Sequence, residues 1–298
     1  MPATQFVCPK TNENIKIGDC LQHCMAGQRC MFLPTLRSVA ASLDRKLDKP
    51  SVTELISGTR ETFLKKTTDY AVDPMQQLYA IHGSAVHTIN ENHTDGNMLS
   101  EERLADNITS GKFDLYGEIV DINDKTLGDY KITSSFKLMK ALGYYKVDVP
   151  TGEVYKTGLK KGQPKTKKVW RTDGVRQLYE WAIQVNAYRL LLEEHNFPVD
   201  DMYIQVYVRD YSLRMASERN IDKPMYLLHI NRISDSWLYL YFSMKKTLLD
   251  EALKNGAAPG FCNHRETWGG RKCKEYCDVY EECKKLYEAS QPAPGAAA

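Results

Sequence analysis

The sequence predicts a mixed α/β fold of the α+β type, in which helices flank a mixed central sheet. Apolar residues at helical spacing predict helices over 32–47, from 51 onward, and over 74–92, 174–194 and 235–254. Alternating β-branched and aromatic residues predict strands over 112–122, 126–133, 202–209 and 225–233. Because two strands precede the 174–194 helix and two follow it, the order favours a mixed sheet over a doubly wound parallel one.

Local signals place the boundaries of these elements. Lys49-Pro50 ends the first helix, because proline cannot continue the hydrogen-bond ladder, and Ser51 is a candidate N-cap for the next helix. Asn123 and Asp124 are turn-forming residues between the first two strands. The segment 112–133 is therefore predicted to form a β-hairpin.

Composition divides the chain into four segments. A Cys-rich segment with one helix covers 1–48, a core covers 49–256, a second Cys-rich segment covers 257–290, and an Ala- and Pro-rich tail over 291–298 is expected to be disordered.

An insertion at about 144–174 interrupts the core. It is basic and broken by Gly and Pro, which predicts a protruding loop or ribbon. Lysines neutralise phosphates and aromatic rings stack on bases, so this insertion is a candidate nucleic-acid contact; a solvated flexible loop is the alternative. Its cations and rings are Lys156, Lys160, Lys161, Lys165, Lys167, Lys168, Arg171, Tyr155 and Trp170.

Charge and hydropathy narrow the functional classes. The net charge is +2, from 40 Lys plus Arg and 38 Asp plus Glu, so any nucleic-acid footprint must be local. No apolar run approaches the roughly 20 residues of a membrane span, and the first residues lack the apolar core of a signal peptide. We therefore expect no membrane partner and a cytoplasmic location, in a bacterial, archaeal or phage-infected cell.

The eight cysteines form two clusters of four, one near each end of the sequence. In a reducing compartment this favours metal ligation over disulfides, and each cluster alone could supply four thiolates to a metal. The spacings are nearly equal, Cys-x11-Cys-x3-Cys-x5-Cys and Cys-x10-Cys-x3-Cys-x5-Cys. The clusters are Cys8, Cys20, Cys24 and Cys30, and Cys262, Cys273, Cys277 and Cys283.

Two aspartates and a lysine lie on the predicted hairpin. Asp121 ends its first strand, and Asp129 and Lys131 alternate on the second, so that the latter two side chains point to one face. Two carboxylates can bind Mg²⁺ and leave coordination positions open for phosphate and water, while the ammonium could orient or deprotonate the attacking water.

These residues carry a family resemblance. LYGEIVDI followed by LGDYKITSS resembles the central motif of the PD-(D/E)XK nuclease superfamily, GSAVHTINE resembles the Gly-x3-His-x3-Glu helix of its RecB-like branch, and QVNAYRLLL resembles its Gln-x3-Tyr helix. The resemblance covers about 83–192, in the family's order. It implies a restriction-endonuclease-like core and metal-dependent hydrolysis of phosphodiester bonds.

The resemblance also implies individual roles. The metal would be bound by His87, Asp121, Asp129 and the backbone carbonyl of Ile132. It would be Mg²⁺ or Mn²⁺, and an imidazole beside carboxylates favours Mn²⁺ more than an all-oxygen site does. Lys131 would be the catalytic lysine. The residues expected to position the scissile phosphate are Gln184 and Tyr188, with Glu91 as a weaker supporting candidate.

Some RecB-like nucleases, including CRISPR-associated exonucleases, bind a 4Fe-4S cluster through cysteines near the C-terminus. The spacing here, Cys273-x3-Cys277-x5-Cys283, is one residue longer than the usual Cys-x2-Cys-x5-Cys. Three arrangements fit: two four-thiolate zinc sites, two iron-sulfur clusters, or one cluster shared between the two ends. Thiolates select such metals over Mg²⁺, so their expected role is structural.

The sequence thus favours a metal-dependent exonuclease that acts on DNA ends or single-stranded DNA, in association with recombination or replication proteins. Two alternatives stay open: a nucleic-acid-binding or scaffold protein that keeps the nuclease fold, and an RNA nuclease.

Overall fold

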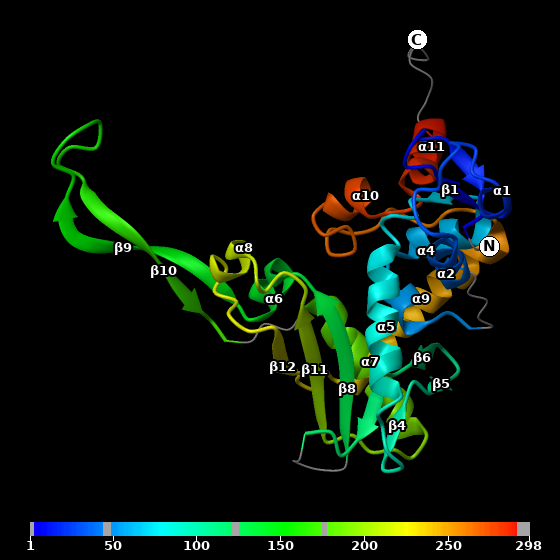
Figure 1. Cartoon of the computed structure of the whole chain (residues 1–298). Coiled ribbons are helices and arrows are strands. Elements are labelled where there is room, and N and C mark those ends of the chain that lie inside the picture. The colour runs from blue at the N-terminus through cyan, green and yellow to red at the C-terminus, as the bar shows by residue number, and fades with distance from the viewer. Residues whose placement is uncertain (1–2, 44–48, 121–124, 175–177, 291–298) are drawn as a thin grey trace, which may run out of the picture.

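The computed structural model describes residues 3–43, 49–120, 125–174 and 178–290 (Figure 1). Its centre is a five-stranded sheet in the order β12-β11-β8-β7-β4. The strands are β4 (Met98–Ser100), β7 (Leu115–Gly117), β8 (Thr126–Thr133), β11 (Asp201–Val208) and β12 (Met225–His229). β11 runs parallel to β8 and the other neighbouring pairs are antiparallel. The expected mixed sheet flanked by helices is therefore confirmed.

Helices lie on both faces of this sheet. α5 (Leu78–Glu91) packs on the face to which Tyr130 and Ile132 of β8 point, and α7 (Tyr179–Glu194) packs on the opposite face (Figure 1). α9 (Asp235–Asn255) covers α7 and also packs against α4 (Thr59–Thr67). Because side chains alternate along a strand, neighbouring residues of β8 reach two different helices.

Two fully buried polar residues fix α7. The Asn186 side chain donates to the carbonyls of Ala182 and Asn231 and accepts from the amide of Ile233, and the Arg189 guanidinium pairs with Asp235 at 2.7 Å. A buried polar group needs such partners to offset its desolvation. These bonds hold α7 against the segment that leads from β12 to α9.

The predicted helix from residue 51 is two helices in the structure. Ser51 is the expected N-cap, in a capping box with Glu54 at the start of α3 (Val52–Ile56). Ser57 is extended, and α4 begins after Gly58. A Cβ at Gly58 would lie 2.1 Å from the sulfur of Cys262, so the break is also where the C-terminal segment approaches the core most closely.

The predicted hairpin forms with a first strand shorter than expected. β7 pairs antiparallel with β8 in the register Leu115↔Gly128 and Gly117↔Thr126. One step beyond this ladder, the same register sets Asp114 opposite Asp129. The expected turn at Asn123 and Asp124 lies outside the described residues, as does Asp121.

The N-terminal segment folds around a small core of its own. It contains a three-stranded sheet in the order β2-β1-β3, formed by β2 (Asn14–Lys16), β1 (Gln5–Val7) and β3 (Ala71–Val72), with α1 (Ile17–Gln22) and α2 (Leu33–Leu43). Its buried apolar residues are Ala3, Phe6, Leu36, Val39 and Val72.

The insertion forms an antiparallel ribbon that projects from the body of the molecule (Figure 1). Its strands are β9 (Tyr144–Val154) and β10 (Pro164–Thr172), and α6 (Ser135–Ala141) precedes it. A second two-stranded sheet, β5 (Arg103–Ala105) with β6 (Ser110–Lys112), packs on α7. The short α8 (Arg214–Ser217) lies beside α6.

The C-terminal segment contains α10 (Arg271–Glu275) and α11 (Tyr280–Ser290), and α11 packs on α4. The expected tail over 291–298 lies outside the described residues. Within the described chain, no helix combines the length and the apolar character needed to cross a membrane.

Candidate metal centre

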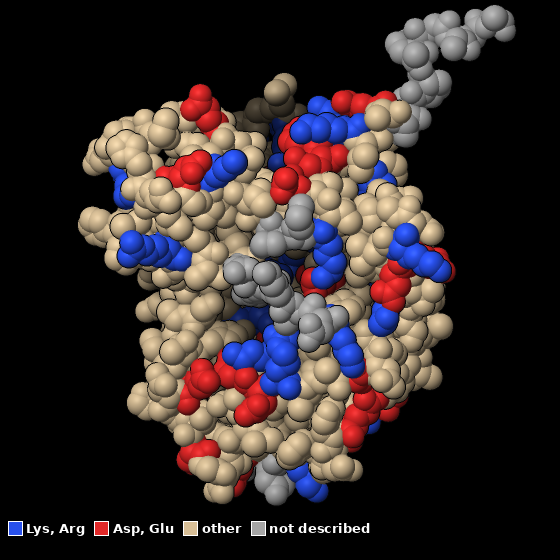
Figure 2. Space-filling model, turned by 90° about the vertical axis from the view of Figure 1, so that its right-hand side faces the viewer, with Lys and Arg blue, Asp and Glu red and all other residues tan. Residues whose placement is uncertain are grey.

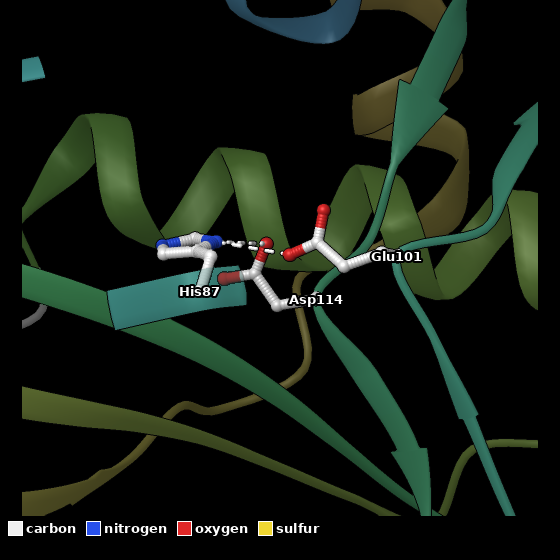
Figure 3. A group of neighbouring side chains, drawn as sticks. All are labelled: His87, Glu101 and Asp114. Carbon is white, nitrogen blue, oxygen red and sulfur yellow. Dashed lines mark hydrogen bonds and ion pairs between the residues drawn. The ribbon is translucent and has the colours of Figure 1, made fainter. Parts of the chain in front are cut away.

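Three side chains from different elements converge beside the edge of β7 (Figure 3). His87 projects from α5, Glu101 follows β4 with a positive φ of 54°, and Asp114 immediately precedes β7. His87 Nδ1 lies 3.0 Å from Glu101 Oε1 and 3.4 Å from Asp114 Oδ1. One ligand atom from each lies within 4.8 Å of the others, so the three side chains could hold a divalent cation.

The neighbouring strand adds a carboxylate and a lysine. Asp129 is buried, and Lys131 Nζ lies 2.9 Å from its Oδ1 and 2.6 Å from its Oδ2. Both carboxylate oxygens therefore lie within ion-pair distance of the Lys131 ammonium, and Oδ2 accepts no hydrogen bond from the described residues. A carboxylate oxygen has more than one lone pair, so Oδ2 could also bind a cation beside the ammonium.

Asp114 and Asp129 are close enough to affect each other's ionisation. Burial first and the negative charge of Asp129 second raise the pKa of Asp114 to about 7, against the opposing effects of Lys131 and His87 and of a 2.7 Å hydrogen bond from the Tyr130 amide. Two buried carboxylates repel each other unless a proton or a cation lies between them. A divalent metal would supply the missing positive charge.

This raised pKa gives a stability prediction for the metal-free protein. Asp114 binds its proton more tightly when folded than when unfolded, so folding should lose stability as pH rises from about 4 to about 7. Asp114→Asn removes the charge. In EDTA the variant should be more stable than the wild type at pH 8, by on the order of 1–3 kcal/mol, and should lose this advantage near pH 4.

Urea unfolding at the two pH values measures this effect. Asp250→Asn, a change at an exposed carboxylate on α9, is the control and should give the same small difference at both pH values. A difference between Asp114→Asn and wild type that does not change with pH would contradict the buried, raised-pKa carboxyl.

A cleft leads to these residues. Its walls come from α3, α5, β5, β6 and α7, and it is open to solvent. Tyr188 of α7 lines the cleft together with His87 and Asp114, and burial and the Asp129 charge raise the pKa of the phenol. The Gln184 side-chain amide donates to the Tyr188 hydroxyl at 2.9 Å. The cleft also contains Arg103, Lys112, Ser84, Thr88 and Glu91.

Gly111 on β6 lets the Tyr188 ring lie in this cleft. A Cβ at Gly111 would stand 2.8 Å from two ring carbons of Tyr188 and 2.9 Å from a methyl group of Leu191. Gly111→Ala should therefore displace the ring, destabilise the fold by about 1–3 kcal/mol, and lower any activity of the cleft by about 10- to 100-fold. Thermal melting and rate are measured beside Gly96→Ala, whose Cβ would meet nothing within 4 Å. An unchanged melting temperature would show that Tyr188 is not held as described.

The structure brings several sequence-predicted site residues to one place and adds two others. His87, Asp129, Lys131, Gln184 and Tyr188 all lie at or beside the cleft. Ile132 follows Lys131, and its side chain points to α5, 4.0 Å from where a Cβ of Gly83 would be. Glu91 lines the cleft one turn after His87.

Two candidate metal ligands are absent from the sequence-based set. Glu101 has no periodic pattern around it, because it lies in a connection with a left-handed backbone. Asp114 could have been found by counting back through the hairpin, since its register places Asp114 opposite Asp129. The predicted partner, Asp121, lies outside the described residues.

All eight cysteines are half-buried free thiols. The N-terminal four line one cavity. The C-terminal four lie near the start of α4: Cys283 accepts a hydrogen bond from Arg60 at 3.1 Å, and burial, followed by the Glu61 charge, raises the pKa of Cys277 to about 12. Among the described residues, no three sulfur atoms lie within 4.8 Å of one another. The cysteine-ligated centres therefore stay a prediction.

Comparison with known proteins gives no independent assignment. A scan against protein-family models finds no family that matches this chain, and a search of curated proteins finds no similar one.

Proposed function

We propose that the protein is a divalent-metal-dependent nuclease with a PD-(D/E)XK core that hydrolyses DNA at ends or in single strands. One observation carries the proposal: His87 and Asp114 meet beside Asp129 and Lys131, which lie at the centre of a mixed sheet. A structural ion-pair network would explain the charges. It would leave unexplained the convergence of His87, Glu101 and Asp114 beside a solvent-open cleft.

The donor set suits Mg²⁺ or Mn²⁺, since it consists of carboxylates and one imidazole. His87, Glu101 and Asp114 would hold the metal, with Asp129 on the neighbouring strand as a further oxygen donor. When bound, the metal supplies a Lewis acid for the phosphate and lowers the pKa of a bound water. Glu101 also pairs with Lys112, so the cleft adds a cation on the wall of β6.

Lys131, and Gln184 with Tyr188 of α7, would act on the attacking water and the scissile phosphate. In the metal-free protein the Lys131 ammonium is held by Asp129. A lysine in this place can orient the attacking water or stabilise charge on the phosphorus centre. The Tyr188 hydroxyl, held by Gln184, would donate to the scissile phosphate from the opposite helix.

A second cavity beside Gln184 extends the surface available to a strand of nucleic acid. It is lined by Tyr179, Trp181, Trp268 and three cations. Lys137 Nζ stands 5.0 Å from the Trp181 ring, and Arg265 stands 5.1 Å from the Tyr179 ring. Trp181 is buried and Trp268 is exposed, so Trp268, which lies among these cations and the carboxylates of Glu180 and Glu266, is the ring on which an unpaired base could stack. This favours single strands or frayed ends over an intact duplex.

The ribbon would provide further substrate contact. Lys146 lies over the Trp170 ring at 4.6 Å, and the tip carries Lys160 and Lys161, which are exposed. Basic and acidic side chains are interspersed on the face drawn in Figure 2, in keeping with the net charge of +2. A local basic projection therefore fits better than a broad basic surface.

Replacing Lys160, Lys161 and Lys168 by Gln should weaken single-stranded DNA binding by about 10-fold and reduce its salt dependence, because each phosphate contact releases counterions. Cleavage of saturating substrate should stay unchanged, since the ribbon projects from the body of the molecule, away from the helix α5 that carries His87 (Figure 1). The control replaces three exposed lysines outside the ribbon, Lys254, Lys284 and Lys285. Equal affinities of the two triple variants would rule out the ribbon as a binding element.

Degradation of end-labelled single- and double-stranded DNA, and of RNA, by anaerobically purified protein tests the function. We expect cleavage of DNA with Mn²⁺ or Mg²⁺ and none with EDTA. Cleavage of RNA but not of DNA would mean that the protein is an RNA nuclease. Binding without cleavage of any substrate would favour a nucleic-acid-binding protein that keeps the nuclease fold.

The C-terminal cysteines belong to the same proposal. We propose that they hold a structural metal centre, a 4Fe-4S cluster or Zn²⁺, that fastens α10 and α11 to α4. The visible spectrum of the same anaerobic sample separates the two metals, because thiolate-bound iron-sulfur centres absorb near roughly 400 nm and zinc is colourless.

A further inference from the structure

The N-terminal cysteines come from elements that carry neither the candidate metal centre nor the C-terminal cysteines. Cys8 follows β1, Cys20 lies in α1, and Cys24 and Cys30 bracket the loop that leads to α2. Although 22 residues separate the first from the last in sequence, all four line a single cavity. Its other walls include Phe6, Ile15 and Leu36, from the small N-terminal core and the strand beside it.

The turn that contains Cys8 favours the metal-binding form of its thiol. Cys8 begins a tight turn, in which its amide donates to the Glu13 carbonyl and its carbonyl accepts from Asn12, both at 2.8 Å. Hydrogen bonds from the backbone of Lys10, and from the side chain and backbone of Thr11, lower the pKa of the Cys8 thiol and favour the thiolate, the form that binds metals. Burial instead raises the pKa of Cys20.

Arg29 fixes the remaining three cysteines relative to one another. Its guanidinium donates to the carbonyls of Cys20, Leu21 and Gln22 at 2.6, 3.0 and 3.2 Å. The arginine thereby closes the end of α1 onto the loop that contains Cys24 and Cys30. Arg29 is partly buried, and its bonds to three backbone carbonyls order this segment.

The surrounding unit has a small apolar core. Its strands span two or three residues each, and among the described residues its core has five buried apolar side chains with partly buried ones packed against them. Units of this size usually need a metal or disulfides to stay folded, and these four cysteines are free thiols. A metal bound by these free thiols could therefore stabilise the N-terminal unit.

We infer that Cys8, Cys20, Cys24 and Cys30 form a tetrahedral, structural Zn²⁺ site that fastens the β1–β2 hairpin to α1 and the loop before α2. In such a site the four thiolates stand about 3.8 Å apart around one ion. No three cysteine sulfurs of the described chain lie within 4.8 Å of one another, so binding draws the thiols inward by side-chain rotation into the cavity they line. With no open coordination position, the ion is structural and takes no part in hydrolysis.

Peptide-resolved alkylation of the full-length protein tests this site without any substitution. Zinc-loaded protein is treated with iodoacetamide, with and without prior removal of zinc by a chelator, and modification is quantified by mass spectrometry. We expect the peptides of all four N-terminal cysteines to be protected and to become reactive together when zinc is removed. Equal reactivity of these cysteines before and after chelation would overturn the inference.

Metal content gives a second readout that does not depend on nuclease activity. Cys24→Ser should contain one zinc fewer per chain than wild type and should lose the d–d absorption that Co²⁺ shows in a four-thiolate site. Cys262→Ser is the matched control, because any metal that it loses belongs to the C-terminal cluster and leaves the N-terminal protection pattern intact. Loss of iron instead of zinc from Cys24→Ser, or no loss of metal from folded Cys24→Ser, would refute a zinc site.

Discussion

Lys131→Ala and Asp129→Asn are both expected to abolish cleavage, by about 10³-fold or more, for two different reasons. Asp129 is a buried carboxylate close enough to Asp114 to raise its pKa, and we propose it as a metal ligand, so its replacement should weaken metal binding together with activity. Lys131 reaches Asp129 but is not in the ligand set, so its replacement should leave metal binding intact and remove only the chemical step. Titration calorimetry with Mn²⁺ beside the cleavage assay separates the two effects.

Lys140→Ala is the control for a lysine at the surface, since Lys140 lies at the exposed end of α6 and contacts the Phe136 ring. It should cleave like wild type. Full activity in either Lys131→Ala or Asp129→Asn would place the active site elsewhere. Loss of Mn²⁺ binding in Lys131→Ala would instead make the lysine a requirement for assembling the site.

Periodicity was sufficient to predict the layers of the fold. The helix predicted over 235–254 is α9, and the strand predicted over 202–209 is β11, each within one residue of the observed bounds. Both are long segments with one clear period, which is the case in which pattern decides structure. The helix predicted from residue 51 was wrong in its continuity, because Gly58 ends the helical run where Cys262 packs against it.

Short elements escaped prediction because tertiary pairing makes them. β1, β2 and β3 contain two or three residues each, and β3 joins from more than 60 residues away in sequence. β5 and β6 are stabilised by packing on α7 rather than by their own sequence, as the approach of Gly111 to Tyr188 indicates. Strands this short have little intrinsic preference for the extended state.

Prediction of the candidate site was limited in the same way: residues on one element could be grouped from the sequence, and residues brought together by the fold could not. Residues on one element, such as Asp129 with Lys131 or Gln184 with Tyr188, could be grouped from spacing alone. Glu101 could not, because only the turn after β4 brings it to His87. The choice between Asp114 and Asp121 depended on a strand register, and register follows from which side chains can be buried against α7 and α5.

That choice leads to the second large expected effect. The β7–β8 register, with Leu115 opposite Gly128, places Asp114 opposite Asp129. If Asp114 is therefore the second carboxylate ligand, Asp114→Asn should lower cleavage by about 10²- to 10³-fold, because a neutral amide is a weaker metal ligand than a carboxylate. Asp121→Asn, at the aspartate favoured by sequence alone, should then keep most of the activity. Rates and Mn²⁺ affinities of the two variants decide between them, since the reverse order would assign the second carboxylate ligand to Asp121 and leave Asp114 as a partner of His87.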